Sequence, residues 1–177
     1  MRTLALIGAS LLAILPGAAQ AAAPCLTPAE ASSLAAYALP AAINGTTKRC
    51  ASALAPTSFL RQGGGELAAR YGARKTQSWP AAKAAFFKIG GDGKDESTAM
   101  LRGLPDAPLQ QMLDAIIEGM VAQEIPTQRC GEIDRIVGLL APLPAQNTAD
   151  LIAVMLGIAG KTGKAQNDKF SICKTGS

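Results

Sequence analysis

The stretch from Asp106 to Ile125 constrains the fold more than any other part of the chain. Its apolar residues recur every three or four positions, which is the spacing of a helix with one wide apolar face. Asp106 is placed to cap the first turn, and Pro126 ends the helix. The apolar positions are Leu109, Met112, Leu113, Ile116, Ile117, Met120, Val121 and Ile125. They cover about half of the helix circumference, which is more than one neighbour requires, so we predict the central helix of a bundle.

The other segments also show helical periodicity, and the sequence contains neither a strand pattern nor an internal repeat. Thr27-Pro28-Ala29-Glu30 is a capping box that begins a helix. Pro40 should kink or end that helix, and Asn44-Gly45 is a stop signal. Further helices are expected at about 46–54, 56–71, 78–89, 97–102, 127–140 and 147–160. The fold class is therefore predicted to be an all-α, single-domain bundle of about six to seven helices.

Three of these helices carry more specific expectations. Gly63-Gly64-Gly65 costs a helix roughly 1 kcal/mol per residue relative to alanine, so it marks either a loop or a point of close approach. Thr127 is expected to cap the helix that follows it. The last helix is expected to begin at Asn147 and to direct four apolar residues inward. These residues are Leu151, Ile152, Met155 and Ile158.

The first 21 residues have the composition of a secretory signal peptide. Arg2 precedes an apolar segment, and Ala19-Gln20-Ala21 fits the small-residue cleavage rule. The apolar segment is too short and too interrupted for a permanent anchor. We expect cleavage after Ala21, a single helical domain over 22–177 with a polar tail from about residue 161, no remaining transmembrane segment, and a periplasmic or secreted location.

Four cysteines remain after export: Cys25, Cys50, Cys130 and Cys173. An exported chain with an even number of cysteines usually oxidises them, which predicts two disulfides. Three pairings are possible. The simplest joins Cys25 to Cys50 and Cys130 to Cys173. A metal cluster or a redox-active pair is not expected, because the chain has no CxxC motif and no histidine.

Charge is distributed unevenly along the chain. Residues 26–89 have a net charge of +6, residues 90–160 have −6, and residues 161–177 have +3. One interpretation is a polarised surface for an acidic partner or anionic lipid. The favoured interpretation is that basic and acidic helices face each other within the fold. Only Tyr71 offers a stacking ring between the basic patches, so we expect no nucleic-acid partner.

Reactive chemistry finds little support in the sequence. Without histidine, the common serine and cysteine triads are excluded, and no cofactor motif is complete. Two acid pairs, Asp114 with Glu118 and Glu132 with Asp134, could in principle support carboxylate chemistry, but they lie opposite the apolar faces. The acidic loop 90–96 lacks the calcium-binding spacing. We therefore expect no catalytic, cofactor-binding or metal-binding residues.

These features predict the fold of the chain but say little about its function. The main hypothesis is a non-catalytic envelope protein that binds a protein or an amphipathic small molecule. A ligand groove is expected between an aromatic stripe and the central helix, and its residues are Trp79, Phe86, Ile89, Ile116 and Met120. The alternatives are a secreted carboxylate-type hydrolase and a basic-surface module that associates with anionic envelope components.

Overall fold

The structure is a computed structural model that describes residues 25–90, 96–161 and 171–173. The helices are α1 (Pro28–Cys50), α2 (Phe59–Gly72), α3 (Lys75–Ile89), α4 (Glu96–Gly103), α5 (Asp106–Glu124), α6 (Cys130–Leu140) and α7 (Ala145–Lys161). The short elements are β1 (Cys25–Leu26), the 3-10 helix η1 (Thr127–Arg129) and β2 (Ser171–Ile172). The predicted all-α bundle with two disulfides is thus confirmed. The predicted signal peptide, most of the acidic loop 90–96 and most of the polar tail lie outside the described residues.

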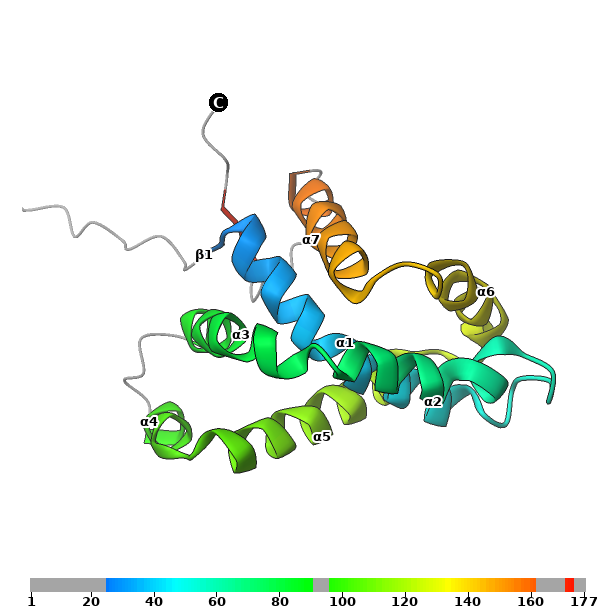
Figure 1. Cartoon of the computed structure of the whole chain (residues 1–177), viewed down its shortest axis with the longest axis horizontal. Helices are drawn as coiled ribbons and strands as arrows, with labels where there is room; N and C mark the ends of the chain where they lie inside the picture. Colours follow the sequence, from blue (N-terminus) through cyan, green and yellow to red (C-terminus); the bar gives the residue numbers. More distant parts are fainter. Residues whose placement is uncertain (1–24, 91–95, 162–170, 174–177) are drawn as a thin grey trace, which may run out of the picture.

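The centre of the bundle is α1, and the prediction that 106–125 would be central is wrong. Figure 1 shows α1 running between the other helices, and it packs against α2, α3, α5 and α7. The predicted bounds of α5 are correct to one residue, but only Leu109 and Leu113 are buried on it. Ile116 and Met120 are exposed, so α5 covers one side of α1.

α1 is one unbroken helix, contrary to the expected kink or end at Pro40 and the stop at Asn44-Gly45. The capping box at its start is confirmed, because Thr27 and Glu30 exchange side-chain and backbone hydrogen bonds. An internal proline costs a helix about 3 kcal/mol. Here packing on four neighbouring helices outweighs that cost, and Pro40 itself is buried.

The glycines that looked like breaks are points of close contact. Gly45 lies against α5, and a Cβ atom there would be 2.5 Å from the carbonyl oxygen of Glu118. The glycine triplet lies inside α2, where a Cβ on Gly64 would be 2.7 Å from Oγ1 of Thr47. The alternative of a close approach within a helix is therefore correct, through Gly64, and the alternative of a loop is wrong.

Three buried clusters surround α1, and each contains a residue of that helix. Tyr37 joins Trp79 of α3 and Leu109 of α5. Ile43 joins residues of α2 and of the start of α7. Ala31 joins Leu26 of β1, together with alanines of α3 and α7. The bundle is thus held together chiefly through its first helix.

The disulfide pairing differs from the simplest expectation. Cys25 pairs with Cys173, with a Cα–Cα distance of 4.9 Å, and Cys50 pairs with Cys130 at 5.5 Å. The physical reason is the continuity of α1. Cys25 precedes a helix of 23 residues and Cys50 is its last residue. The helix is about 35 Å long at 1.5 Å per residue, whereas a disulfide needs Cα atoms within about 7 Å.

Two other local expectations need correction. Thr127 makes no side-chain cap, because it begins η1 and α6 starts only at Cys130. Two strands that the pattern did not predict pair in parallel, with Cys25 opposite Ser171 and Leu26 opposite Ile172. They secure the end of the chain beside the start of α1. Among the described helices, none is both long and apolar enough to cross a bilayer.

Candidate binding surface

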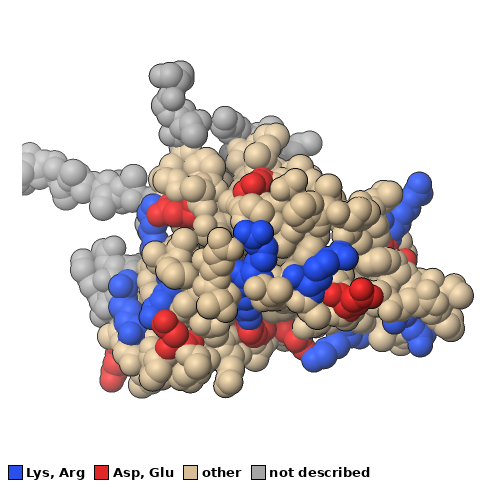
Figure 2. Space-filling view, viewed as in Figure 1, with Lys and Arg blue, Asp and Glu red and all other residues tan. Residues whose placement is uncertain are grey.

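Basic side chains of α1 and α3 face acidic side chains of α5. Lys83 binds Asp106 with an Nζ–Oδ1 distance of 2.7 Å. Two further ion pairs run parallel to it, Lys75 with Asp114 and Lys48 with Glu118. Figure 2 shows the resulting surface, on which blue and red atoms are interspersed. This arrangement supports internal matching as the explanation of the charge asymmetry between residues 26–89 and 90–160.

The acids singled out in the sequence have separate partners. Asp134 of α6 accepts hydrogen bonds from the backbone N–H groups of Phe59 (3.4 Å) and Leu60 (2.6 Å), so it caps the start of α2. Glu132 pairs with Arg129 at 2.9 Å. In the described part of the chain, no three acidic or cysteine side chains gather as a metal site would require. Glu132 and Asp134 are therefore held by different groups.

A buried tyrosine of the core has a strongly shifted pKa. Tyr37 is 1% exposed and donates a hydrogen bond to the carbonyl oxygen of Gln110 at 3.2 Å. Burial, and then the negative charge of Asp114, raise the pKa of Tyr37 far above its ordinary value. The Lys75 Nζ atom lies 4.5 Å from the centre of the same ring. These contacts connect α1, α3 and α5, and they place no reactive group at the surface.

The five residues of the predicted groove lie in three different places: two separate buried clusters and the exposed side of α5. Trp79 is 5% exposed in the cluster with Tyr37, and Phe86 packs against that cluster. Ile89 packs against the separate cluster around Ala31. Ile116 and Met120 are 46% and 54% exposed on α5. Trp79 and Phe86 therefore contribute to the core, and the other three residues do not join them in one cluster.

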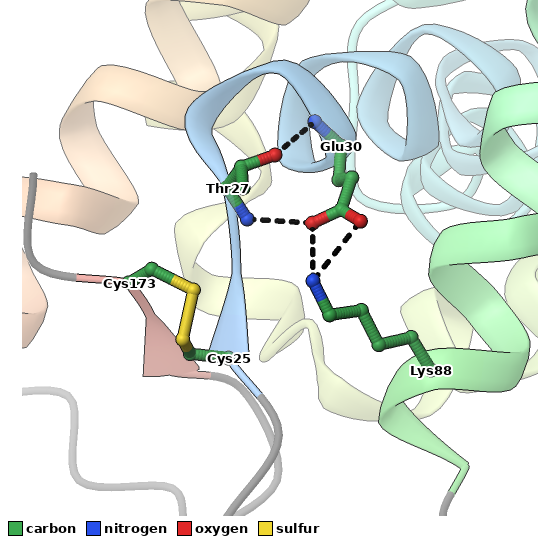
Figure 3. The surroundings of a disulfide bond; sticks show 5 residues. All are labelled: Cys25, Thr27, Glu30, Lys88 and Cys173. Atoms are coloured by element: carbon green, nitrogen blue, oxygen red, sulfur yellow. Dashed lines mark hydrogen bonds and ion pairs between the residues drawn. A yellow bond between two sulfur atoms is a disulfide. The ribbon is translucent and has the colours of Figure 1, made fainter.

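The two ends of the described chain meet in a clasp, shown in Figure 3, beside the Cys25–Cys173 disulfide. Glu30 accepts a hydrogen bond from the Thr27 backbone N–H at 2.7 Å and a salt bridge from Lys88 of α3, also at 2.7 Å. The Lys88 ammonium and the Thr27 amide hold the pKa of Glu30 below its ordinary value of 4.5. The salt bridge between α1 and α3 thus depends on an ionised Glu30.

The lowered pKa of Glu30 gives a prediction for stability against pH. A lowered folded-state pKa means that the unfolded chain binds more protons, so stability is complete above about pH 4.5 and falls as the pH drops below it. Glu30→Gln should flatten this part of the stability curve, as measured by thermal melts between about pH 3 and 6. Glu66→Gln, on the exposed side of α2, is the matched control. Identical slopes for wild type and Glu30→Gln would contradict the prediction.

α7 presents its large side chains to solvent and its small ones to the bundle. Ala145, Ala149 and Ala153 are 6%, 0% and 4% exposed. The expected inward set is wrong for three of its four residues. The exposed apolar residues of α7, with their exposed fractions, are Leu151 (41%), Val154 (58%), Met155 (61%), Leu156 (47%) and Ile158 (58%). We call these five residues the α7 face; in Figure 2 the surface over α7 is mostly free of charge.

Polar contacts fix the rotation of α7, so its outward face is specified by the fold. Ser32 of α1 donates a hydrogen bond to the Asp150 carboxylate. The Gln146 Nε2 atom donates to Ser32 Oγ at 2.9 Å and to Asp150 Oδ1 at 3.0 Å. Thr148 Oγ1 lies 3.0 Å from the hydroxyl of Tyr71. Turning the large residues inward would break the contacts of α7 with Ser32 and Tyr71.

The sequence contains a signal for this orientation that periodicity alone does not reveal. Residues 151–160 carry no charge and are apolar on every side, so a search for one apolar stripe has no unique answer. However, small residues recur every four positions at 145, 149, 153 and 157. Such a row permits a close approach to the alanine-rich start of α1, as it does wherever helices pack through small side chains.

Comparison with known proteins provides no relative: the chain matches no protein-family model, no curated protein and no solved structure.

Proposed function

We propose that this chain is an exported, non-catalytic binding protein of the periplasm or the extracellular space, and that it contacts a protein partner through the α7 face. The amino-terminal 21 residues and the four cysteines support export. All four cysteines form disulfides, and such bonds persist in oxidising compartments. The disulfides brace the scaffold that presents α7.

The main support for this proposal is the outward orientation of five large apolar side chains on one helix. By their exposed fractions these side chains present roughly 500 Å², within the range of about 300–600 Å² of the largest, often functional, apolar patch on a typical monomer. Exposed apolar area of this kind costs solubility, and the polar contacts of Asp150 and Thr148 hold it in place. A docking function explains why the fold maintains it.

The separate pairing of the acids favours binding over hydrolysis. Asp114, Glu118, Glu132 and Asp134 each bind a different partner on a different helix. A hydrolase would need two carboxylates about 5–10 Å apart across a cleft. The basic-surface alternative is also less favoured, because the lysines of α1 and α3 are used in ion pairs with α5 and Glu30.

Site-specific crosslinking tests the proposal. We expect a photo-crosslinking amino acid in place of Met155 to give a discrete protein adduct in the cells that make the chain. The matched control replaces Met100 of α4, which is 69% exposed but outside the α7 face, and we expect no such adduct from it. Mass spectrometry of the adducts identifies the partner. Equal labelling from both positions, or no protein adduct from Met155, would contradict a docking role for α7.

A further inference from the structure

We propose that the partner of the α7 face is a second copy of this chain, which packs its own α7 antiparallel across a two-fold axis. This proposal rests on the proposed function, because it names the occupant of the same surface. In such an isologous dimer both copies use the same surface, so a contact from one residue to a second is repeated from the second residue to the first. The α7 face must therefore be complementary to itself.

The spacing of the α7 face fits helix pairing. Leu151, Val154, Met155 and Ile158 follow one another at intervals of three, one and three residues, which forms a stripe of the kind that packs knobs into holes. An antiparallel register centred between residues 154 and 155 places Leu151 opposite Ile158 of the other copy. The same register places Val154 opposite Met155. Each contact then joins two exposed apolar side chains, and none is left facing a polar residue.

Charge also permits a copy of the same surface to approach. A second copy brings identical charges to an interface, so a charged face would repel itself. No charged residue occurs from Leu151 to Gly160. The antiparallel arrangement also sets the start of each α7 beside the end of the other, which is the favourable orientation of helix dipoles.

The exposed area matches a weak dimer. Two α7 faces of roughly 500 Å² each would bury at most about 1,000 Å², which is the lower limit for a specific interface. Ile136 and Leu139 of α6, which are 47% and 71% exposed, are further apolar side chains close to α7 in the sequence. We therefore expect dissociation constants in the micromolar range.

Sedimentation velocity of the oxidised full chain, from roughly 1 to 300 µM, tests the proposal. The wild type should shift from the mass of one chain to twice that mass over this range. Met155→Glu should weaken association by at least about tenfold, because it places two unpaired carboxylates in an apolar interface. Met100→Glu, the control at a comparably exposed methionine on α4, should associate like the wild type. Circular dichroism confirms that each variant remains helical.

A compensating variant tests the register itself. Combining Val154→Lys with Met155→Glu puts a lysine opposite a glutamate of the other copy at both contacts, and this should restore much of the association lost in Met155→Glu. Val154→Lys alone should remain monomeric. Recovery in the double variant would not occur if Met155→Glu had merely disturbed the fold of α7.

The results separate this proposal from the proposed function. A wild type that stays monomeric throughout, or a Met155→Glu variant that associates like the wild type, would overturn the dimer. If Met155 also crosslinked to a different protein, the docking role would stand and only the second copy would be wrong. A crosslinked adduct of two chains from position 155, together with an association in sedimentation that Met155→Glu weakens and Met100→Glu does not, supports both.

Discussion

Gly45→Ala should lower the free energy of unfolding by about 1–3 kcal/mol or more, the usual cost of overpacking. The new Cβ atom would lie 2.5 Å from the carbonyl oxygen of Glu118 and 3.1 Å from its Cα atom. Both atoms belong to the backbone of α5, so no side-chain rotation can relieve the contact. α1 and α5 would have to separate, which also loosens the cluster of Tyr37 and Leu109. Chemical denaturation of the purified chain measures the change.

The sign of this effect is what distinguishes close packing from helix propensity. Gly65→Ala is the matched control, because Gly65 lies inside α2 and a Cβ atom there would meet nothing within 4 Å. That variant should be more stable than the wild type by about 0.5–1 kcal/mol, the usual gain of alanine over glycine in a helix. If Gly45→Ala were also stabilising, the close approach of α1 to α5 would be wrong.

Local signals predicted the helices but not which of them lies at the centre. The capping box at Thr27 and the bounds of α5 follow from interactions within a few residues of sequence, so the sequence was sufficient for them. Pro40 and Gly45 also act locally, and both favour a break. They are overruled by contacts with four other helices, which are set by residues far away in the sequence. The disulfide pairing was mispredicted for the same reason, since it depends on the length of α1.

The α7 face was not predicted, because apolar character alone does not determine which side of a helix faces the core. Each of the four residues expected inward on α7 is as apolar as a core residue, yet only Ile152 is even partly buried. What decides the orientation is size. α1 offers α7 a surface of alanine and serine, including Ala31 and Ser32, and only small side chains allow the two helices to approach closely. The larger side chains are left outside.

Removing the inner disulfide, by Cys50→Ala together with Cys130→Ala, should lower the free energy of unfolding by about 4 kcal/mol in the chain-entropy model. The bond joins residues 80 positions apart, so it restricts the unfolded chain strongly. It also fastens the end of α1 to the start of α6, and its cysteines are 0% and 1% exposed. The folded state holds both segments in place by other contacts, including the Asp134 cap on α2, so it gains little freedom when the bond is lost.

The outer disulfide should matter less, although it joins residues 148 positions apart and the loop model alone would rank it higher. It joins β1 and β2, each two residues long. These strands are also held by their pairing, by the hydrogen bond from the Cys173 N–H to the Leu26 carbonyl, and by Leu26 and Ile172 in the cluster around Ala31. Without the bond β2 can detach while β1 and the helices stay folded, because Leu26 of β1 is buried against α1, α3 and α7. The folded state then gains entropy as well. Denaturation of Cys25→Ala/Cys173→Ala beside the inner double variant, without reductant, measures the difference. A larger loss for the outer pair would show that the joined strands β1 and β2 are part of the cooperative core and do not open locally.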